Sequence, residues 1–271
     1  MRRFAVVLAL AGCGRFGFRP GEAMSNGDAA ADAVVAVDGS PAVTDAAVPT
    51  PDAAVAIDAP PGPITLPGLL AHYAMNDDPA LGAIASDQLP ATCTAACPTA
   101  TPGRYDGGYH FDGTQYVDLP STTLVGITPY TVAVWLKLDV YPAAGSGAPL
   151  VAKPQDTGQA DTFNLLVLGS STSMETTADG AASDYLGSPL GFSLGEWRHV
   201  AATWDGTTKR LYQGGALVGS EVAPLVDSTQ LVSIGVDRDG GVAAFHLTGS
   251  LDELQFYGRA LSDQEIQTLA Q

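Results

Sequence analysis

The chain has 271 residues, and its 12 Lys and Arg against 29 Asp and Glu give a formal charge of −17. Nucleic acids and anionic lipid headgroups are bound through basic surfaces, so this charge excludes both classes and we expect no nucleic-acid partner. Charged residues make up only 15% of the chain, whereas Gly and Pro number 31 and 19. This balance favours strands and turns over helices.

The first residues have the pattern of a secretion signal. Arg2 and Arg3 precede an apolar run over residues 4–10, which is far too short to span a bilayer. The run ends in "LAGC", which resembles the bacterial lipobox, where the peptidase cuts before the cysteine and Cys13 becomes the lipidated first residue. The alternative is a plain secretory signal with an unrelated cysteine.

The lipobox resemblance implies a lipoprotein signal peptide over residues 1–12 and a lipid anchor in the membrane at Cys13. It therefore implies a location in the bacterial cell envelope, either periplasmic or surface-exposed. Gly14 rather than Asp follows the cysteine. By the same resemblance, this favours the outer membrane.

Residues 13–63 are predicted to be a disordered linker. Residues 21–63 contain no Lys, Arg or aromatic side chain, and "DAAVPTPDAAVAIDAP" at residues 45–60 is a degenerate repeat. Without large side chains, such a segment cannot bury enough apolar area to offset the entropy of ordering. It is either a stalk that holds a domain away from the membrane or a tolerated spacer.

Residues 64–271 have the pattern of short apolar and alternating runs that is typical of an all-β domain. In "YTVAVWLKLDV" (130–140), alternate apolar residues share one face, and "FNLLVLG" (163–169) is apolar on both faces. Gly214-Gly215 separates two strand-like runs and predicts a hairpin turn. The fold class is therefore a two-sheet antiparallel sandwich. Near the end, "ALSDQEIQTLA" (260–270) carries a helix capping box and predicts a short C-terminal helix.

His199 raises the question of catalysis, because it lies in "GEWRHVAATWDG" (195–206) between two tryptophans. In a strand it shares a face with Trp197 and Ala201, and the sequence places no carboxylate or hydroxyl beside it. A general base needs such a partner within hydrogen-bond reach. We therefore interpret His199 as a structural residue.

Four stretches, in order, resemble the LamG-like jelly rolls of the laminin-G and concanavalin A-like group. They are "YHFDGTQYVDLP" (109–120), "YTVAVWLKL" (130–138), "GEWRHVAATWDGTTKRLYQGGALV" (195–218) and "GSLDELQFYGRALSDQEI" (249–266). The resemblance implies a jelly-roll sandwich over residues 64–271. Gln213-Gly214 replaces the usual Val-Asp of the hairpin, which puts in doubt any role that depends on that aspartate.

The group contains glycosidases as well as lectins, and the glycosidases carry "E-x-D-x-x-E" on one strand. That motif is absent here, and so are other hydrolase signatures. We therefore expect a non-catalytic binding module that recognises a glycan or an envelope protein. Two alternatives stay open: a glycan-active hydrolase with an unrecognised site, and a ligand-free structural envelope lipoprotein.

Two further features concern the stability of the domain. Cys93 and Cys97 accompany Cys13 as the chain's three cysteines, and in an oxidising compartment they predict a disulfide, with free thiols as the alternative. The family resemblance also implies a structural calcium near the last strand. Its ligands would be Asp252 with oxygens from the first loop: Asn76, Asp77, Asp78 or Asp87.

Overall fold

The computed structural model describes residues 62–79, 83–84, 86, 89–93, 96–119, 129–155, 160–176 and 184–271. All of them lie in the compact unit Ile57–Gln271. The predicted signal peptide, Cys13, most of the predicted linker and the calcium candidate Asp87 lie outside the described residues. Within the described ranges, no helix has the length and apolar composition needed to cross a bilayer.

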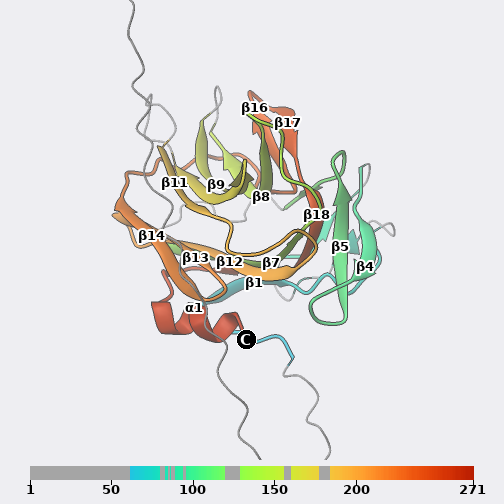
Figure 1. Cartoon of the computed structure of the whole chain (residues 1–271), viewed down its shortest axis with the longest axis horizontal. Coiled ribbons are helices and arrows are strands. Elements are labelled where there is room, and N and C mark those ends of the chain that lie inside the picture. The colour runs from blue at the N-terminus through green and yellow to red at the C-terminus, as the bar shows by residue number, and fades with distance from the viewer. Residues whose placement is uncertain are drawn as a thin grey trace, which may run out of the picture. The chain divides into compact units, whose positions relative to one another are not determined.

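In the part of the chain that the structure describes, two antiparallel sheets of eight strands face each other (Figure 1). Sheet A has the order β14-β13-β12-β7-β18-β5-β4, and β1 also pairs with β18. Its strands are β1 (Leu69–Tyr73), β4 (Thr99–Pro102), β5 (Gly107–Asp112), β7 (Tyr130–Leu138), β12 (Trp197–Trp204), β13 (Thr208–Gln213), β14 (Ala216–Val222) and β18 (Thr248–Tyr257).

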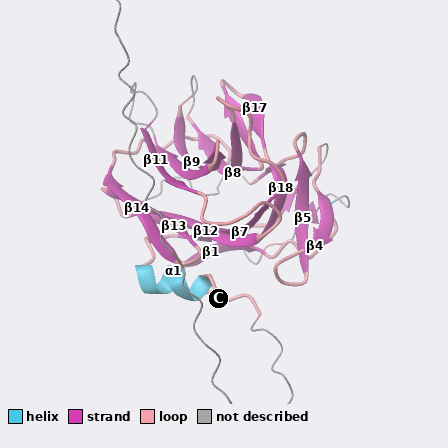
Figure 2. Ribbon diagram, in the orientation of Figure 1, coloured by secondary structure: helices cyan, strands magenta, loops and turns pink. Residues whose placement is uncertain are grey.

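Sheet B has the order β11-β10-β9-β8-β15-β6-β3-β2. Its strands are β2 (Ala83–Ile84), β3 (Ala91–Thr92), β6 (Val117–Asp118), β8 (Gly147–Pro154), β9 (Asp161–Leu168), β10 (Ser171–Thr176), β11 (Asp184–Pro189) and β15 (Ser233–Ile234). Figure 2 shows how strands dominate the described chain, with helix α1 (Asp263–Leu269) near its end. The predicted all-β sandwich with a short C-terminal helix is confirmed.

The core lies between the two sheets and follows the predicted alternation. Val134 and Leu136 of β7 point inward, and so do Phe163 and Leu165 of β9; all four are at most 2% exposed. Because a strand's side chains alternate between its faces, the residues between them lie on the outer faces of the sandwich. The two outer faces differ in what covers them.

Helix α1 covers part of the outer face of sheet A (Figure 1). Ile266 packs there against Ala133, Ala201 and Tyr212 in a second apolar cluster. The predicted capping box is present, because the Ser262 hydroxyl accepts a bond from Glu265 N and the Glu265 carboxylate accepts one from Ser262 N. The sequence signal therefore predicted where this helix begins.

Part of the outer face of sheet B is covered by a hairpin of β16 (Val236–Asp239) and β17 (Val242–His246), which packs on β8. The chain turns out of sheet B at Gly235, whose φ is 76° and whose N–H donates to Leu150 O at 3.1 Å. A Cβ at Gly235 would lie 2.6 Å from the Phe111 ring. Only glycine combines this backbone conformation with such a close approach.

Two local features can be compared with the sequence predictions: a hairpin turn and a bulge in a strand. The predicted turn at Gly214-Gly215 joins β13 to β14, and both glycines have positive φ. In β18, the register shifts between Asp252 and Gln255, and Glu253 has a φ of 52°. Simple alternation did not predict this β-bulge, which re-aims side chains locally.

Candidate functional site

A continuous row of paired residues crosses the outer face of sheet B, and we call it the polar row. Glu175 of β10 pairs with Tyr185 of β11 on one side and with Asn164 of β9 on the other. The same register continues across β8, β15 and β6 through Ala152, Ser233 and Asp118. Directly paired residues in antiparallel strands share a face, so these six side chains lie in one row, in which Ala152 separates three polar residues from the other two.

The middle of the polar row meets two further carboxyl groups. Asn164 Nδ2 donates to Asp161 Oδ2 at 3.1 Å, and Asp161 is also hydrogen-bonded to Glu175. From the covering hairpin, Asp237 is hydrogen-bonded to Asp161. Asp161, Glu175 and Asp237 are 2%, 3% and 7% exposed. We call these three residues the carboxyl cluster.

Burial is the main influence on the charges of this cluster. It raises the pKa of Asp161 far above its ordinary range, and the neighbouring Asp237 and Glu175 charges add to the rise. Burial also raises the pKa of Asp237, against the opposing hydrogen bond from Arg238 N. Carboxyl groups in contact cannot all ionise, so they share protons. The cluster therefore keeps a shared proton, which lets one carboxyl group donate a hydrogen bond to another.

The two ends of the polar row are more accessible than its middle. Tyr185 is 46% exposed on the edge strand β11. At the other end, Arg238 Nη2 of the hairpin contacts both carboxylate oxygens of Asp118, at 2.9 and 2.8 Å, and its guanidinium lies over the Tyr116 ring. An exposed ring beside buried polar groups is an arrangement suited to a polar ligand with an apolar face.

His199 lies in β12 on the outer face of sheet A, the face that we predicted it to share with Trp197 and Ala201, and the structure places it beside Trp135. The two rings meet edge to face with centroids 5.5 Å apart, and His199 is 3% exposed. Burial lowers the pKa of His199 to about 3, so the imidazole is neutral at physiological pH. Its Nδ1 has no hydrogen-bond partner. Among the described residues, no hydrogen bond joins the ring to a carboxylate or a hydroxyl, so its surroundings are those of a packed structural residue.

Asp252 holds a turn in place. Its Oδ2 accepts bonds from the backbone N–H groups of Arg104 and Tyr105 at 2.8 and 2.9 Å, in the loop between β4 and β5. Its Oδ1 is buried without a hydrogen-bond partner. Burial raises the pKa of Asp252 to about 7, and the Glu253 charge contributes. This orphan oxygen is the atom that a bound cation would satisfy.

The other candidate calcium ligands are already engaged as acceptors. Asn76 Oδ1 accepts a bond from Gly107 N at 2.7 Å, and Asp77 Oδ1 accepts one from the Tyr109 hydroxyl. Asp78 lies exposed beside them. Among the described residues, no three His, Cys, Asp or Glu side chains gather into a metal-holding group. A calcium ion at Asp252 would therefore need Asn76 or backbone carbonyl oxygens, and it stays a prediction.

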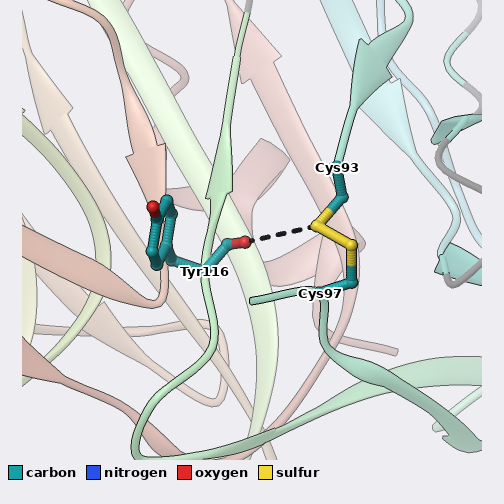
Figure 3. The surroundings of a disulfide bond; sticks show 3 residues. All are labelled: Cys93, Cys97 and Tyr116. Atoms are coloured by element: carbon teal, nitrogen blue, oxygen red, sulfur yellow. Dashed lines mark hydrogen bonds between the residues drawn. A yellow bond between two sulfur atoms is a disulfide. The ribbon is translucent and has the colours of Figure 1, made fainter. Parts of the chain in front are cut away.

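Cys93 and Cys97 form a disulfide (Figure 3). Cys93 is 7% exposed and belongs to the main core, and its Sγ lies 3.7 Å from the carbonyl oxygen of Tyr116. The bridge closes the loop after β3 between residues 93 and 97, and Tyr116 N, just before β6, donates to Ala96 O of that loop at 2.9 Å. Tyr116 is the residue on which Arg238 stacks, so this backbone hydrogen bond links the loop to one end of the polar row.

Comparisons with known proteins identify the family to which this chain belongs. A family model described as the concanavalin A-like lectin/glucanases superfamily matches residues 111–267, more than half of the chain. The chain belongs to this superfamily. A comparison with curated proteins found no match.

Solved structures show the same fold at low sequence identity. Domain 4 of AbnA, an extracellular arabinanase from Geobacillus stearothermophilus solved with arabinotriose, is 20% identical with a TM-score of 0.60, over 75% of this chain and 98% of that one. The CBM40 of a Ruminococcus gnavus sialidase, bound to α2,3-sialyllactose, is 18% identical with a TM-score of 0.51, over 60% and 96%. The binding domain of Paraclostridial Mosquitocidal Protein 1 is 13% identical with a TM-score of 0.56, over 75% and 52%.

The sequence of this superfamily member did not lead us to predict the polar row. Asn164 stands in a strand that we predicted to be apolar on both faces, and its partners Glu175 and Tyr185 come from strands separated by loops. One signal was available: Asp161 and Asn164 are polar residues within an otherwise apolar run. Because polar groups in central strands are buried only with partners, they indicated a specific polar site.

Proposed function

We propose that the domain is a non-catalytic glycan-binding module whose ligand lies on the polar row. The observation that carries this proposal is the pairing of the exposed Tyr185 with buried polar groups of β10 and β9. Sugars offer apolar ring faces that stack on aromatic side chains, and hydroxyl groups that pair with carboxyl and amide groups. The neighbours solved with arabinotriose and sialyllactose support this class of ligand.

The carboxyl cluster is unsuited to glycoside hydrolysis, which is why we propose binding without turnover. Glycosidases place two carboxyl groups about 5 Å apart when they retain configuration and about 6.5–9.5 Å apart when they invert it. Asp161 is instead hydrogen-bonded to both Glu175 and Asp237, which leaves no room for a sugar bond between them. Hydrolysis of a glycosidic bond would require the carboxyl groups of the cluster to move apart.

We propose further that this module is displayed at the bacterial cell envelope. The lipobox-like "LAGC" and the Ala- and Asp-rich segment after it support a lipid anchor followed by a spacer. An envelope protein remains the alternative class of partner, because the fold alone does not identify a ligand. A displayed glycan-binding site would attach the cell to a polysaccharide or to a glycosylated surface.

The test is calorimetric titration of the full chain with a panel of neutral, amino and acidic oligosaccharides. Binding should weaken at least about tenfold in Tyr185→Ala, the change produced by losing about 1.4 kcal/mol. Tyr141→Ala is the matched control, because Tyr141 is 43% exposed and lies outside the polar row. Equal affinity of the Tyr185→Ala and Tyr141→Ala variants would exclude the polar row as the binding site. Release of reducing sugar would contradict the proposal that the module is non-catalytic.

A further inference from the structure

The strand that carries Tyr185 is weakly held by its own residues. β11 is the edge strand of sheet B, and among the described strands it forms its ladder with β10. None of its six residues is buried, and Leu186 is the one that packs against the main core. Strands with few buried contacts are the parts of a fold that open most easily. A ligand that stacks on Tyr185 therefore needs β11 to be fixed by other parts of the domain.

Lys209 reaches β11 from the other sheet. It lies in β13 opposite Trp204, a residue of the main core, so its side chain points between the two sheets. It is 0% exposed, and its Nζ donates to Asp184 O at 2.8 Å and to Thr176 Oγ1 at 3.2 Å. Asp184 and Thr176 are the terminal cross-strand pair of β11 and β10. Lys209 therefore holds the end of the ladder that lies next to Tyr185.

The same ammonium group also contacts the edge strand of sheet A. Lys209 Nζ lies 2.8 Å from Glu221 Oε1 of β14 and 3.4 Å from Asp184 Oδ2. Figure 1 shows β11 and β14 at the same side of the sandwich, and the two strands are in contact. An ammonium group has three hydrogens, and Asp184 O, Thr176 Oγ1 and Glu221 Oε1 provide an acceptor for each. Lys209 therefore joins the two edge strands at one point.

A second side chain of β13 holds the other end of β11. Gln213 Nε2 donates to Pro189 O at 2.9 Å. Lys209, Leu211 and Gln213 are alternate residues of β13, and Leu211 belongs to the main core. Both donors therefore extend from the inner face of sheet A to backbone carbonyl oxygens of β11. Hydrogen bonds from the opposite sheet fix this edge strand where apolar burial does not.

We propose that Lys209 is a positioning residue of the glycan site, because it fixes the backbone from which Tyr185 projects. This inference rests on the proposed glycan-binding function and adds a buried residue that the ligand does not touch. Tyr185 follows Asp184 directly, so the carbonyl group that Lys209 holds belongs to the peptide unit that joins these two residues. Fixing this unit before the ligand arrives removes an ordering cost that would otherwise reduce the affinity.

The protein should still fold when the ammonium group is removed. The side chains of Glu221 and Asp184 are 35% and 51% exposed, so water can solvate both carboxylates once the cation is gone. Replacing buried ionic groups by apolar side chains of similar volume is often neutral for stability. Methionine is unbranched and adapts to the space that the lysine chain leaves. Lys209→Met therefore tests the position of β11 rather than folding.

The first measurement is hydrogen exchange of the full chain, which needs no ligand. The backbone amides of β11 should exchange faster in Lys209→Met, whereas those of β7 and β18 should not change. Lys153→Met is the matched control, because Lys153 is also fully buried and paired with a carboxylate, Asp227, but lies in β8. Unchanged exchange of β11 in Lys209→Met, or the same increase in both variants, would overturn the positioning role.

The second measurement is calorimetric titration with arabinotriose and 3′-sialyllactose, the sugars bound in two of the solved neighbours. Lys209→Met should weaken binding by about threefold to tenfold, the range expected when one more side chain must be ordered on binding. In a Tyr185→Ala background, the same change should have no further effect, because Lys209 acts through Tyr185. An equal loss of affinity with and without the Tyr185 ring would contradict the proposal.

The results separate this proposal from the proposed function. Faster exchange of β11 in Lys209→Met with unchanged affinity for both sugars would overturn the positioning role while glycan binding stands. If the unmodified chain bound neither sugar, the proposed function would fail for these ligands, and the binding role of Lys209 would fail with it.

Discussion

Asp237 of the β16–β17 hairpin is hydrogen-bonded to Asp161 of β9, and this contact joins the hairpin to the sheet through two carboxyl groups. Two carboxylates repel each other, so the contact holds only while a proton is shared between them. The hairpin that covers sheet B is therefore attached through a group whose charge depends on pH.

Stability should fall as pH rises, because the folded state holds the shared proton more tightly than the unfolded state. Burial raises the pKa of Asp161, whereas an unfolded aspartate ionises at about pH 3.9. Above that pH the folded state binds more protons, and the free energy of unfolding decreases by at most about 1.4 kcal/mol per pH unit for one proton. Asp161→Asn should reduce this slope and raise the melting temperature at pH 8.

The control for that prediction is Asp112→Asn, in which an exposed aspartate is changed. Hydrogen bonds from Thr114 lower the pKa of Asp112, so its contribution to stability is lost only as pH falls through the acid range. Asp112→Asn should therefore leave the slope between pH 5 and pH 8 unchanged. An identical slope in Asp161→Asn and the unmodified protein would show that the Asp161–Asp237 proton does not stabilise the fold.

His199→Gln should change stability and leave glycan binding intact. The ring packs on Trp135 and is buried, and replacing such a group typically costs about 1–3 kcal/mol. Burial lowers the pKa of His199 to about 3, so the unfolded state binds the extra proton as pH falls below about 6.5. His199→Gln should remove this part of the acid destabilisation, measured by denaturation at pH 7 and pH 4. Loss of sugar binding with unchanged stability would contradict the structural role.

The sequence predicted the features that depend on local pattern. The inward face of β7, the turn at Gly214-Gly215 and the cap at Ser262 all follow from alternation, glycine and helix chemistry at neighbouring positions. The structural interpretation of His199 depends on the same local information, because its surroundings are set by its own strand and the paired Trp135, and it stays a prediction.

Beyond the polar Asp161 and Asn164 in an apolar run, the polar row and the carboxyl cluster could not be predicted, because they depend on register between strands. Glu175, Asn164 and Asp161 meet only once β9 and β10 are paired, and Asp237 joins them only because the chain turns at Gly235. Nothing near Asp237 in the sequence indicates that its carboxyl group faces Asp161. The bulge at Glu253 is likewise a property of β18 pairing with three other strands.

Cys13→Ala should release the protein from membranes without altering the domain. Several acyl chains on one cysteine anchor a protein firmly, since each buried CH₂ contributes about 0.8 kcal/mol. Fractionation of cells should place the unmodified chain with the membranes and the variant in the soluble fraction. The melting temperature of the two should agree, because Cys13 lies outside the compact unit Ile57–Gln271. A variant that stays with the membranes would show that lipidation is not the anchor.

Asp252 provides the test of calcium. Its Oδ2 is held by two backbone N–H groups and its Oδ1 is buried without a partner, so a cation would complete the coordination of a carboxylate that burial otherwise disfavours. A ligand that binds only the native state stabilises it by about 2.7 kcal/mol at a hundredfold excess over Kd. Calcium should therefore raise the melting temperature relative to a chelator, and Asp252→Ala should remove the difference.

The competing account is that Asp252 only fixes the Arg104–Tyr105 turn, and the two accounts differ in one measurement. If the turn alone matters, Asp252→Ala lowers the melting temperature equally in calcium and in chelator. Asn76→Ala separates them further, because Asn76 Oδ1 bonds to Gly107 N in the same region and is the side-chain oxygen that a calcium ion would recruit. A calcium-dependent loss in Asn76→Ala would support the ion, whereas equal melting temperatures of the unmodified chain in both buffers would reject it.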